Sequence, residues 1–314
     1  MKLILTGASG FVGRNVLLRA PREWEILALY YQATDLEAFV SRHRLAHVRP
    51  VKCNLTDEAE VHAVAAAAGG RADAALYLAA NSDPTPSAAR PRWDLESNTV
   101  ALITFLEHCQ VGRVVFASSG AVYDGLVGDV TPSTPVDPHL PYAISKLASE
   151  QYVRFFAERR RAIDSFVNVR FFGAYGPHEP ERKITTRWLR AVMAGQRSFT
   201  VRGNGHNLID FMYVDDAVDA FLALATAVGY SGTVDLASHA PVSVNDVVKT
   251  MARVLGVEVS VAHQGNTEEF IQFISVDRTM RERFGFEPKA SFEDGVRHLH
   301  AHFVQEGSGV GQSA

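Results

Sequence analysis

Three residues have types and spacing that suit proton transfer at a carbon-bound hydroxyl. Tyr142 and Lys146 lie four residues apart in a stretch with helical spacing, so their side chains share one face. A phenol with its usual pKa of about 10 is a poor base, but a nearby cation favours the phenolate. The hydroxyl of Ser119 could hold a substrate oxygen beside Tyr142. The set predicts proton transfer at a carbinol while a hydride moves to or from a cofactor.

The cofactor site is predicted at the start of the chain. Residues 3–5 form an apolar run typical of a strand buried on both faces, and helical spacing begins at Phe11. Gly7, Gly10 and Gly13 lie at this junction. Glycine lets the backbone approach a diphosphate, and the free N–H groups and dipole of a helix start favour the anion. With a strand before it and a helix after it, the triplet predicts a dinucleotide-binding turn.

The rest of the chain predicts the elements that position these residues. Strands are expected at 24–31, 47–52, 72–80, 113–117 and 167–172, with long helices at 93–109 and 142–161 between them. Regular alternation of strand and helix predicts a Rossmann-type, doubly wound parallel α/β sheet with a smaller C-terminal α/β substrate lobe. The expected divisions are a dinucleotide-binding domain at 1–172, an interleaved substrate lobe at 173–305 and a Gly/Ser-rich disordered tail at 306–314.

The end of the second strand does not decide between NAD and NADP. A dinucleotide fold usually carries an acid there for the adenosine ribose. That place falls near Tyr30, and Asp35 comes too late unless the turn is unusual. Arg14, directly after the third glycine, could meet a 2′-phosphate, although such a residue is more often a solvated first-turn side chain. Both cofactors therefore stay open.

Composition excludes several classes of function. The 314 residues are 47% hydrophobic, which is enough for a large core, and a net charge of −4 gives no basic footprint for a nucleic acid. Cys53 and Cys109 sit in apolar surroundings, so we expect no disulfide, and a reducing cytoplasm fits. We see no signal peptide, membrane span or metal-ligand spacing.

Taken together, these motifs resemble the extended short-chain dehydrogenases/reductases, in the branch of sugar-nucleotide epimerases and dehydratases, over nearly the whole chain. By resemblance, Tyr142 is the catalytic acid/base, Lys146 is its partner and also holds the nicotinamide ribose, and Ser119 orients the substrate. The resemblance also implies a homodimer through the helices at 93–109 and 142–161. The segments that carry it are Thr6–Gly13, Leu76–Ala80, Asn98, Ser118–Tyr123, Tyr142–Lys146, Arg170–Pro177 and Asp210–Asp216.

The same reasoning names two sets of binding residues. The residues expected to contact the cofactor are Gly7, Ser9, Gly10, Phe11, Val12, Gly13, Arg14, Tyr30, Asn54, Leu55, Leu78, Ala79, Ala80, Asn98, Ala117, Tyr142, Lys146 and Phe171. The residues expected to contact the substrate are Ser82, Ser119, Gly120, Gly173, Arg182 and Arg202.

Two departures from the family pattern narrow the reaction. The dehydratases of this family resemble one another in an Asp-Glu pair directly after the Ser/Thr, where this chain has Gly120 and Ala121. Without that acid, 4,6-dehydration is not expected, and epimerisation, oxidation or reduction remains. The polar residues with which the epimerases hold the substrate diphosphate are replaced by Gly173, Ile209 and Gln272.

Three functions remain open from the sequence. The first is an NAD(P)-dependent enzyme that oxidises, reduces or epimerises a secondary alcohol of a sugar, with the sugar carried on a nucleotide. The second is a ketoreductase or dehydrogenase for a secondary metabolite without a nucleotide. The third is a cofactor-binding regulator without turnover, which would not need Ser119, Tyr142 and Lys146.

Overall fold

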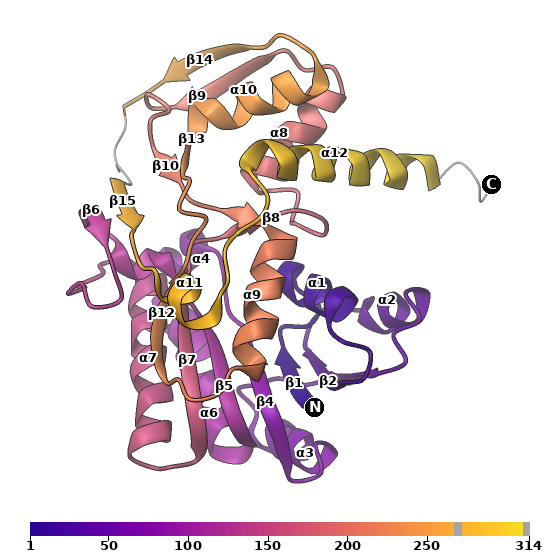
Figure 1. Cartoon of the computed structure of the whole chain (residues 1–314), viewed down its shortest axis with the longest axis vertical. Helices are drawn as coiled ribbons and strands as arrows, with labels where there is room; N and C mark the ends of the chain where they lie inside the picture. The colour runs from indigo at the N-terminus through magenta and orange to yellow at the C-terminus, as the bar shows by residue number, and fades with distance from the viewer. Residues whose placement is uncertain (267–271, 310–314) are drawn as a thin grey trace.

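The computed structural model describes residues 1–266 and 272–309, and its largest element is a parallel sheet (Figure 1). The strands of this sheet are β1 (Lys2–Thr6), β2 (Glu25–Tyr30), β3 (Val48–Lys52), β4 (Arg71–Tyr77), β5 (Gln110–Ser119), β7 (Ile163–Phe171) and β12 (Gly232–Leu236). Their order is β12-β7-β5-β4-β1-β2-β3, and every neighbouring pair is parallel. The chain therefore winds outward from β1 in one direction and from β4 in the other, which is the predicted doubly wound arrangement.

Helices cover both faces of the sheet and close two hydrophobic cores. On β1, Leu3 and Leu5 point into one core and Ile4 into the other, and all three are fully buried, as the two-residue period of a strand requires. Burial of each such side chain contributes roughly 1.5–3 kcal/mol. The helices that line these cores are α1 (Phe11–Arg19), α2 (Leu36–Arg42) and α9 (Val214–Thr226) on one side, and α3 (Glu58–Ala67), α6 (Ala101–His108) and α7 (Pro141–Glu158) on the other.

A smaller lobe lies beyond the carboxyl ends of the strands, at the top of Figure 1. Its own core contains Trp188, Leu189 and Met251, all buried. Its elements are β8 (Ala174–Tyr175), α8 (Ile184–Met193), β9 (Ser198–Arg202), β10 (Leu208–Ile209), β11 (Met212–Tyr213), β13 (Val242–Ser243), α10 (Val244–Leu255), β14 (Ser260–Gln264) and α12 (Phe292–Gly309). Three further elements run between the two parts: β6 (Val127–Val130), β15 (Gln272–Ser275) and α11 (Thr279–Phe284).

The division of the chain differs from a simple boundary at residue 172. The edge strand β12 pairs with β7 from Gly232↔Val167 to Leu236↔Phe171, and α9 packs against α1, β4 and β5. Both elements come from the C-terminal half of the chain. The body that contains the parallel sheet is therefore completed by residues that follow part of the smaller lobe.

The helix expected at 93–109 is three elements. The structure has α5 (Pro91–Leu95), a π-helical turn at Glu96–Val100 and then α6. A short helix, α4 (Pro84–Ala89), precedes them, and both α4 and α5 have proline within their first two positions, where its missing N–H costs no hydrogen bond. Pro84 and Pro91 therefore begin short helices here.

Smaller differences concern element ends. The fourth strand ends at Tyr77, three residues before the expected end. Helix α12 continues to Gly309, so the first four residues of the expected disordered tail are helical, and residues 310–314 lie outside the described part. Over residues 1–266 and 272–309, the structure has no helix with the length and apolarity needed to cross a bilayer.

Candidate active site

The glycine turn after β1 leaves one side of its backbone open. At Gly13, an added Cβ would lie 2.3 Å from the Gly7 carbonyl oxygen, because α1 packs directly on the turn. Gly7 has φ +68°, and a Cβ there would lie 2.9 Å from the Ala79 nitrogen. A Cβ added at Gly10 would lie 3.2 Å from the Gly7 oxygen and, apart from its chain neighbours and the backbone of α1, within 4 Å of no other atom of the described residues. Gly10 therefore borders open space at the start of α1, which fits the approach of a diphosphate to free N–H groups.

The turn is joined to the end of β4 by Thr6. Its hydroxyl oxygen accepts hydrogen bonds from the Leu78 and Ala79 N–H groups, both at 3.0 Å. This holds the expected cofactor residues after β4 beside those after β1. Other members of that set lie at the carboxyl ends of β2, β3, β5 and β7, namely Tyr30, Asn54, Leu55, Ala117 and Phe171. Because the strands are parallel, these residues share one edge of the sheet.

An acid that follows the second strand, Asp35, lies close to Arg14. Asp35 caps α2, and its Oδ1 accepts a hydrogen bond from Arg14 Nη2 at 2.7 Å. Arg14 Nε also donates to the Ser9 carbonyl at 2.9 Å, and the guanidinium lies 4.9 Å from the centroid of the Phe39 ring. The bond from Arg14 lowers the pKa of Asp35. The five residues after Tyr30 thus form a turn that places Asp35 beside Arg14, although by its position in the sequence this acid comes after the end of the strand.

Ser119, Tyr142 and Lys146 lie together at the end of β5 and the start of α7. Lys146 is buried, and its Nζ donates to the Ala117 carbonyl at 2.7 Å and lies 6.0 Å from the centroid of the Tyr142 ring. Burial lowers the pKa of Lys146 to about 8, against the opposing effect of Asp94 and Glu150. Burial raises the pKa of Tyr142, and a hydrogen bond with the Ser119 side chain opposes that shift.

The two serines that end β5 face different ways. Ser119 Oγ accepts from the Ala121 N–H at 3.1 Å and caps the 3₁₀ turn that follows. Ser118 is buried, and its Oγ donates to Glu150 Oε1 at 2.5 Å. The pleat of the strand therefore leaves Ser119 on the side of Tyr142 and sends Ser118 into the core.

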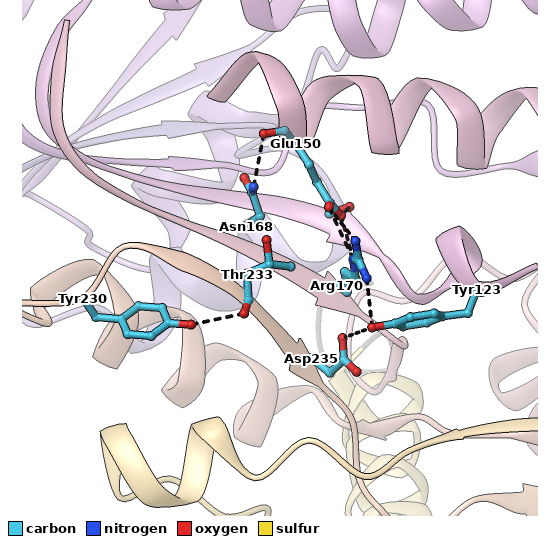
Figure 2. A network of polar contacts seen from close by, with 8 residues as sticks. Tyr123, Glu150, Asn168, Arg170, Tyr230, Thr233 and Asp235 are labelled. Carbon is cyan, nitrogen blue, oxygen red and sulfur yellow. Dashed lines mark hydrogen bonds and ion pairs between the residues drawn. The ribbon is translucent and has the colours of Figure 1, made fainter. Parts of the chain in front are cut away.

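A network of buried, hydrogen-bonded side chains lies next to α7 (Figure 2). Arg170 on β7 forms an ion pair with Glu150 at 3.0 Å, and its Nη1 donates to the Tyr123 hydroxyl oxygen at 3.0 Å. The Tyr123 hydroxyl donates to Asp235 Oδ1 at 2.8 Å, and Ser275 donates to the other oxygen. Burial raises the pKa of Asp235 to about 7. This network of side chains joins α7, β7, β12 and β15.

The expected substrate residues are only partly brought together. Gly120 lies against the Phe172 ring, 3.0 Å from the position of an added Cβ, so this ring is behind the position where the dehydratases have their acid. Gly173 has φ +133°, a conformation that L side chains rarely adopt. Arg182 lies 3.6 Å from Asp83, in the loop that also contains Ser82. Arg202 ends β9 in the separate β9/β14 sheet and is exposed.

Two expected contacts have other surroundings. Asn54 uses its side chain locally, accepting from the Thr56 N–H and hydroxyl. Ile209 is half-buried in β10, whereas the side chain of Gln272 lies outside the described residues. In the described part of the chain, no group of three or more His, Cys, Asp or Glu residues is placed to hold a metal ion.

Sequence reasoning missed two buried acids near Lys146. Glu150 follows it by four residues on the same helix face, a spacing that was readable. Asp94 is four residues before Asn98 in the same helical stretch, which was a signal of the same kind, but its approach to α7 has no local signature. Asn98 itself lies in the π-helical turn, and its Oδ1 accepts from the Asn81 N–H at 2.7 Å.

Comparison with known proteins gives a consistent result. A dTDP-glucose 4,6-dehydratase of Mycolicibacterium smegmatis is 27% identical, over 94% of this chain and 91% of its own. The UDP-glucose 4-epimerase of Thermotoga maritima, solved with UDP-glucose, has a TM-score of 0.86 at 21% identity, covering 98% of this chain and 99% of its own. The Streptomyces venezuelae dTDP-glucose 4,6-dehydratase DesIV, solved with NAD bound, has a TM-score of 0.84 at 22% identity, covering 99% and 98%.

The family itself is given by the sequence match rather than by the fold. The model of the NAD dependent epimerase/dehydratase family matches residues 3–235, which includes the glycine turn, Ser119, Tyr142 and Lys146. That range covers the whole seven-stranded sheet except the first residue of β1 and the last residue of β12. This chain belongs to the NAD-dependent epimerase/dehydratase family.

Proposed function

We propose that this enzyme oxidises, reduces or epimerises a secondary alcohol of a sugar, with the sugar carried on a nucleotide. The observation that carries the proposal is the grouping of Ser119, Tyr142 and Lys146 at the sheet edge that also holds the open glycine turn. The cofactor of the family is NAD. When bound, NAD supplies an acceptor or donor of hydride.

Each of the three side chains has a distinct role. Tyr142 takes or gives the proton of the reacting hydroxyl. Lys146, in its ammonium form, stabilises the phenolate and holds a ribose hydroxyl of the cofactor. Ser119, already hydrogen-bonded with Tyr142, orients the substrate oxygen beside the phenol. The other expected cofactor residues, which include Ala117 at the end of β5 and Asn98 in the π-helical turn, form the rest of the cofactor site.

We further propose that the reaction is not a 4,6-dehydration, although the relatives include enzymes of that name. Elimination of a hydroxyl needs an acid to protonate the leaving group. Gly120 and Ala121 cannot supply one, and Phe172 lies where a side chain on residue 120 would begin. A transient ketone that is then reduced from either face, or a net oxidation or reduction, needs no such acid.

A second candidate function is favoured by the apolar surroundings of the expected diphosphate site. A side chain on Gly173 would begin 3.6 Å from the Cβ of Phe211, and Ile209 is half-buried, so neither position presents a charge there. A ketoreductase or dehydrogenase for a smaller substrate without a nucleotide would need none. The nucleotide-linked sugar stays the first choice because relatives on both sides of the family are named for such substrates.

The enzyme is also proposed to be a homodimer. Large apolar side chains are exposed on two neighbouring helical stretches: Trp93, Leu95, Val100, Ile144, Tyr152 and Phe155. A paired copy of the same surface would cover them. Sedimentation velocity should give twice the chain mass, and Phe155→Glu should give the monomer; a monomeric parent protein would contradict this assembly.

A ligand panel tests the function. Thermal unfolding is measured with NAD and with UDP-, dTDP-, CDP- and GDP-sugars, because a ligand of the folded state raises the melting temperature. We expect NAD and one nucleotide class to act together. Stabilisation by NAD but by no sugar nucleotide would favour the smaller substrate, and no response to NAD would contradict the proposal. Tightly retained NAD in the purified protein would favour an epimerase, whose redox cycle closes on the enzyme.

A further inference from the structure

Asp94 is completely buried and accepts four hydrogen bonds from side chains. Its Oδ1 accepts from Asn81 Nδ2 at 2.9 Å, from Ser87 Oγ at 2.6 Å and from Asn98 Nδ2 at 3.0 Å. Its Oδ2 accepts from Ser145 Oγ at 2.7 Å. Burial of a carboxylate is costly unless its oxygens are hydrogen-bonded. The four hydrogen bonds therefore indicate that the surrounding side chains are arranged to hold this carboxylate.

These bonds join three parts of the active site. Asn81 and Ser87 belong to the loop after β4 and to α4, and Asn98 belongs to the π-helical turn. Ser145 lies on α7, three residues after Tyr142 and directly before Lys146. Asn98 Nδ2 also donates to Ser145 Oγ at 3.0 Å. Asp94 is thus the point at which the first turn of α7 is tied to the cofactor edge of β4.

The carboxylates of Asp94 and Glu150 both oppose the lowering of the Lys146 pKa by burial, and Asp94 does so more strongly. Glu150 is held in an ion pair by Arg170 at 3.0 Å, so much of its charge is already balanced. Among the described residues, no lysine or arginine forms an ion pair with Asp94. On the side of β5, Lys146 Nζ donates to the Ala117 carbonyl and lies 5.0 Å from the centroid of the Phe116 ring. Tyr142 faces it from its own helix.

We propose that Asp94 is a positioning residue, whose carboxylate holds the first turn of α7 against the loop after β4 and whose charge keeps the buried Lys146 protonated. The inference rests on the proposed function, in which Lys146 must be an ammonium group to stabilise the Tyr142 phenolate. Burial alone lowers the pKa of a lysine by several pH units, and a nearby carboxylate restores it. The pKa of Lys146, lowered to about 8, is the net result of these two opposed effects.

The protonation of Lys146 can be measured directly in the cofactor-free protein. The chain has only six lysines, so the Cε resonances of ¹³C-lysine-labelled protein are few enough to follow by NMR. Lys146→Arg identifies the resonance of Lys146. We expect a titration midpoint near 8 in the parent protein. In Asp94→Asn, which keeps the shape but removes the charge, the midpoint should fall by roughly one pH unit.

Ser87→Ala is the matched control, because it removes one hydrogen bond to Asp94 and leaves the charge. Its midpoint should stay at the parent value, although its melting temperature falls. An unchanged midpoint in Asp94→Asn, or an equal fall in both variants, would overturn the proposal. If Asp94→Asn does not fold, the parent protein decides: a midpoint below about 6, where an uncompensated buried lysine titrates, would contradict it. No substrate is needed, so this result is independent of the ligand panel.

Discussion

The guanidinium of Arg14 and the carboxylate of Asp35 form a hydrogen-bonded ion pair, 2.7 Å from Nη2 to Oδ1, beside the start of the glycine turn. The pair decides what a cofactor's adenosine ribose would meet at the end of β2. A free guanidinium would attract a 2′-phosphate, whereas a guanidinium already bound to a carboxylate does so far less. The negative charge of Asp35 would also repel the phosphate.

We therefore expect the protein to bind NAD more tightly than NADP, and Asp35→Ala to raise the affinity for NADP roughly tenfold by releasing Arg14. Calorimetric titration with each cofactor measures the change. Glu37→Ala is the control, since Glu37 is an exposed acid on the same helix that is bound to Tyr30 instead. An equal gain in both variants would mean that general charge, not the Arg14–Asp35 pair, sets the preference.

Replacement of Tyr142 by Phe should remove turnover and leave the fold and NAD binding intact, because only the proton-transfer group is lost. Activity with the identified substrate, NAD affinity and melting temperature are measured together. Tyr152→Phe, an exposed tyrosine on the same helix, is the control and should stay active. Near-parental turnover by Tyr142→Phe would remove the core of the mechanism.

The glycines of the turn should separate binding from folding. Gly10 has φ −77° and ψ 175°, which any residue adopts, so Gly10→Val should weaken NAD binding far more than it lowers the melting temperature. Gly13→Ala should do the reverse, because its Cβ would overlap the Gly7 oxygen and Ala8. Parental NAD affinity in Gly10→Val would show that the diphosphate lies elsewhere.

UDP-glucose and UDP-galactose should be poor ligands. Two charge-assisted contacts of the kind that the family's epimerases make are each worth roughly 1.5–3 kcal/mol, so their loss weakens binding roughly 100-fold or more. Calorimetry with UDP-glucose in the presence of NAD, at physiological salt, tests this. Micromolar binding with rapid conversion to UDP-galactose would show that the replacement of two arginines by Ile209 and Gln272 has no functional meaning.

The stability of the protein should depend on Asp235. Its folded pKa of about 7 lies above the value of about 3.9 in an unfolded chain, so the folded state holds a proton that the unfolded state has lost. Stability therefore falls as the pH rises from about 4 to 7 and is level above that. Asp235→Asn removes this dependence, and its stability relative to the parent should rise by roughly 2–3 kcal/mol between pH 5 and pH 8. Urea unfolding at the two pH values measures it; a difference that does not change with pH would contradict the assignment.

The predictions that held depended on local pattern. The run at Leu3–Leu5, the glycines after it and the four-residue spacing of Tyr142 and Lys146 are each properties of a few consecutive residues. They predict a buried strand, a phosphate-binding turn and a shared helix face. The buried strand, the helix, the parallel sheet and the family are confirmed, and phosphate binding at the turn stays a prediction. The pairing of Ser291 with Asp294 at the start of α12 is readable for the same reason: Ser291 Oγ accepts from the Asp294 N–H at 3.1 Å and donates to Asp294 Oδ2.

The tertiary structure alone brings together residues that are far apart in the sequence and that no helix or strand periodicity relates. Asp94 reaches Ser145 across 51 residues, and Tyr123 reaches Asp235 across 112, because the strand order places their elements side by side. The turn that returns Asp35 to Arg14 depends on how five residues pack after β2. Sequence by itself predicted the strands of the sheet, the glycine turn and the helix that carries Tyr142 and Lys146, and the proton-transfer role of Tyr142 stays a prediction. The order of the sheet decided which buried charges face Lys146, since contacts between distant segments follow from packing rather than from spacing.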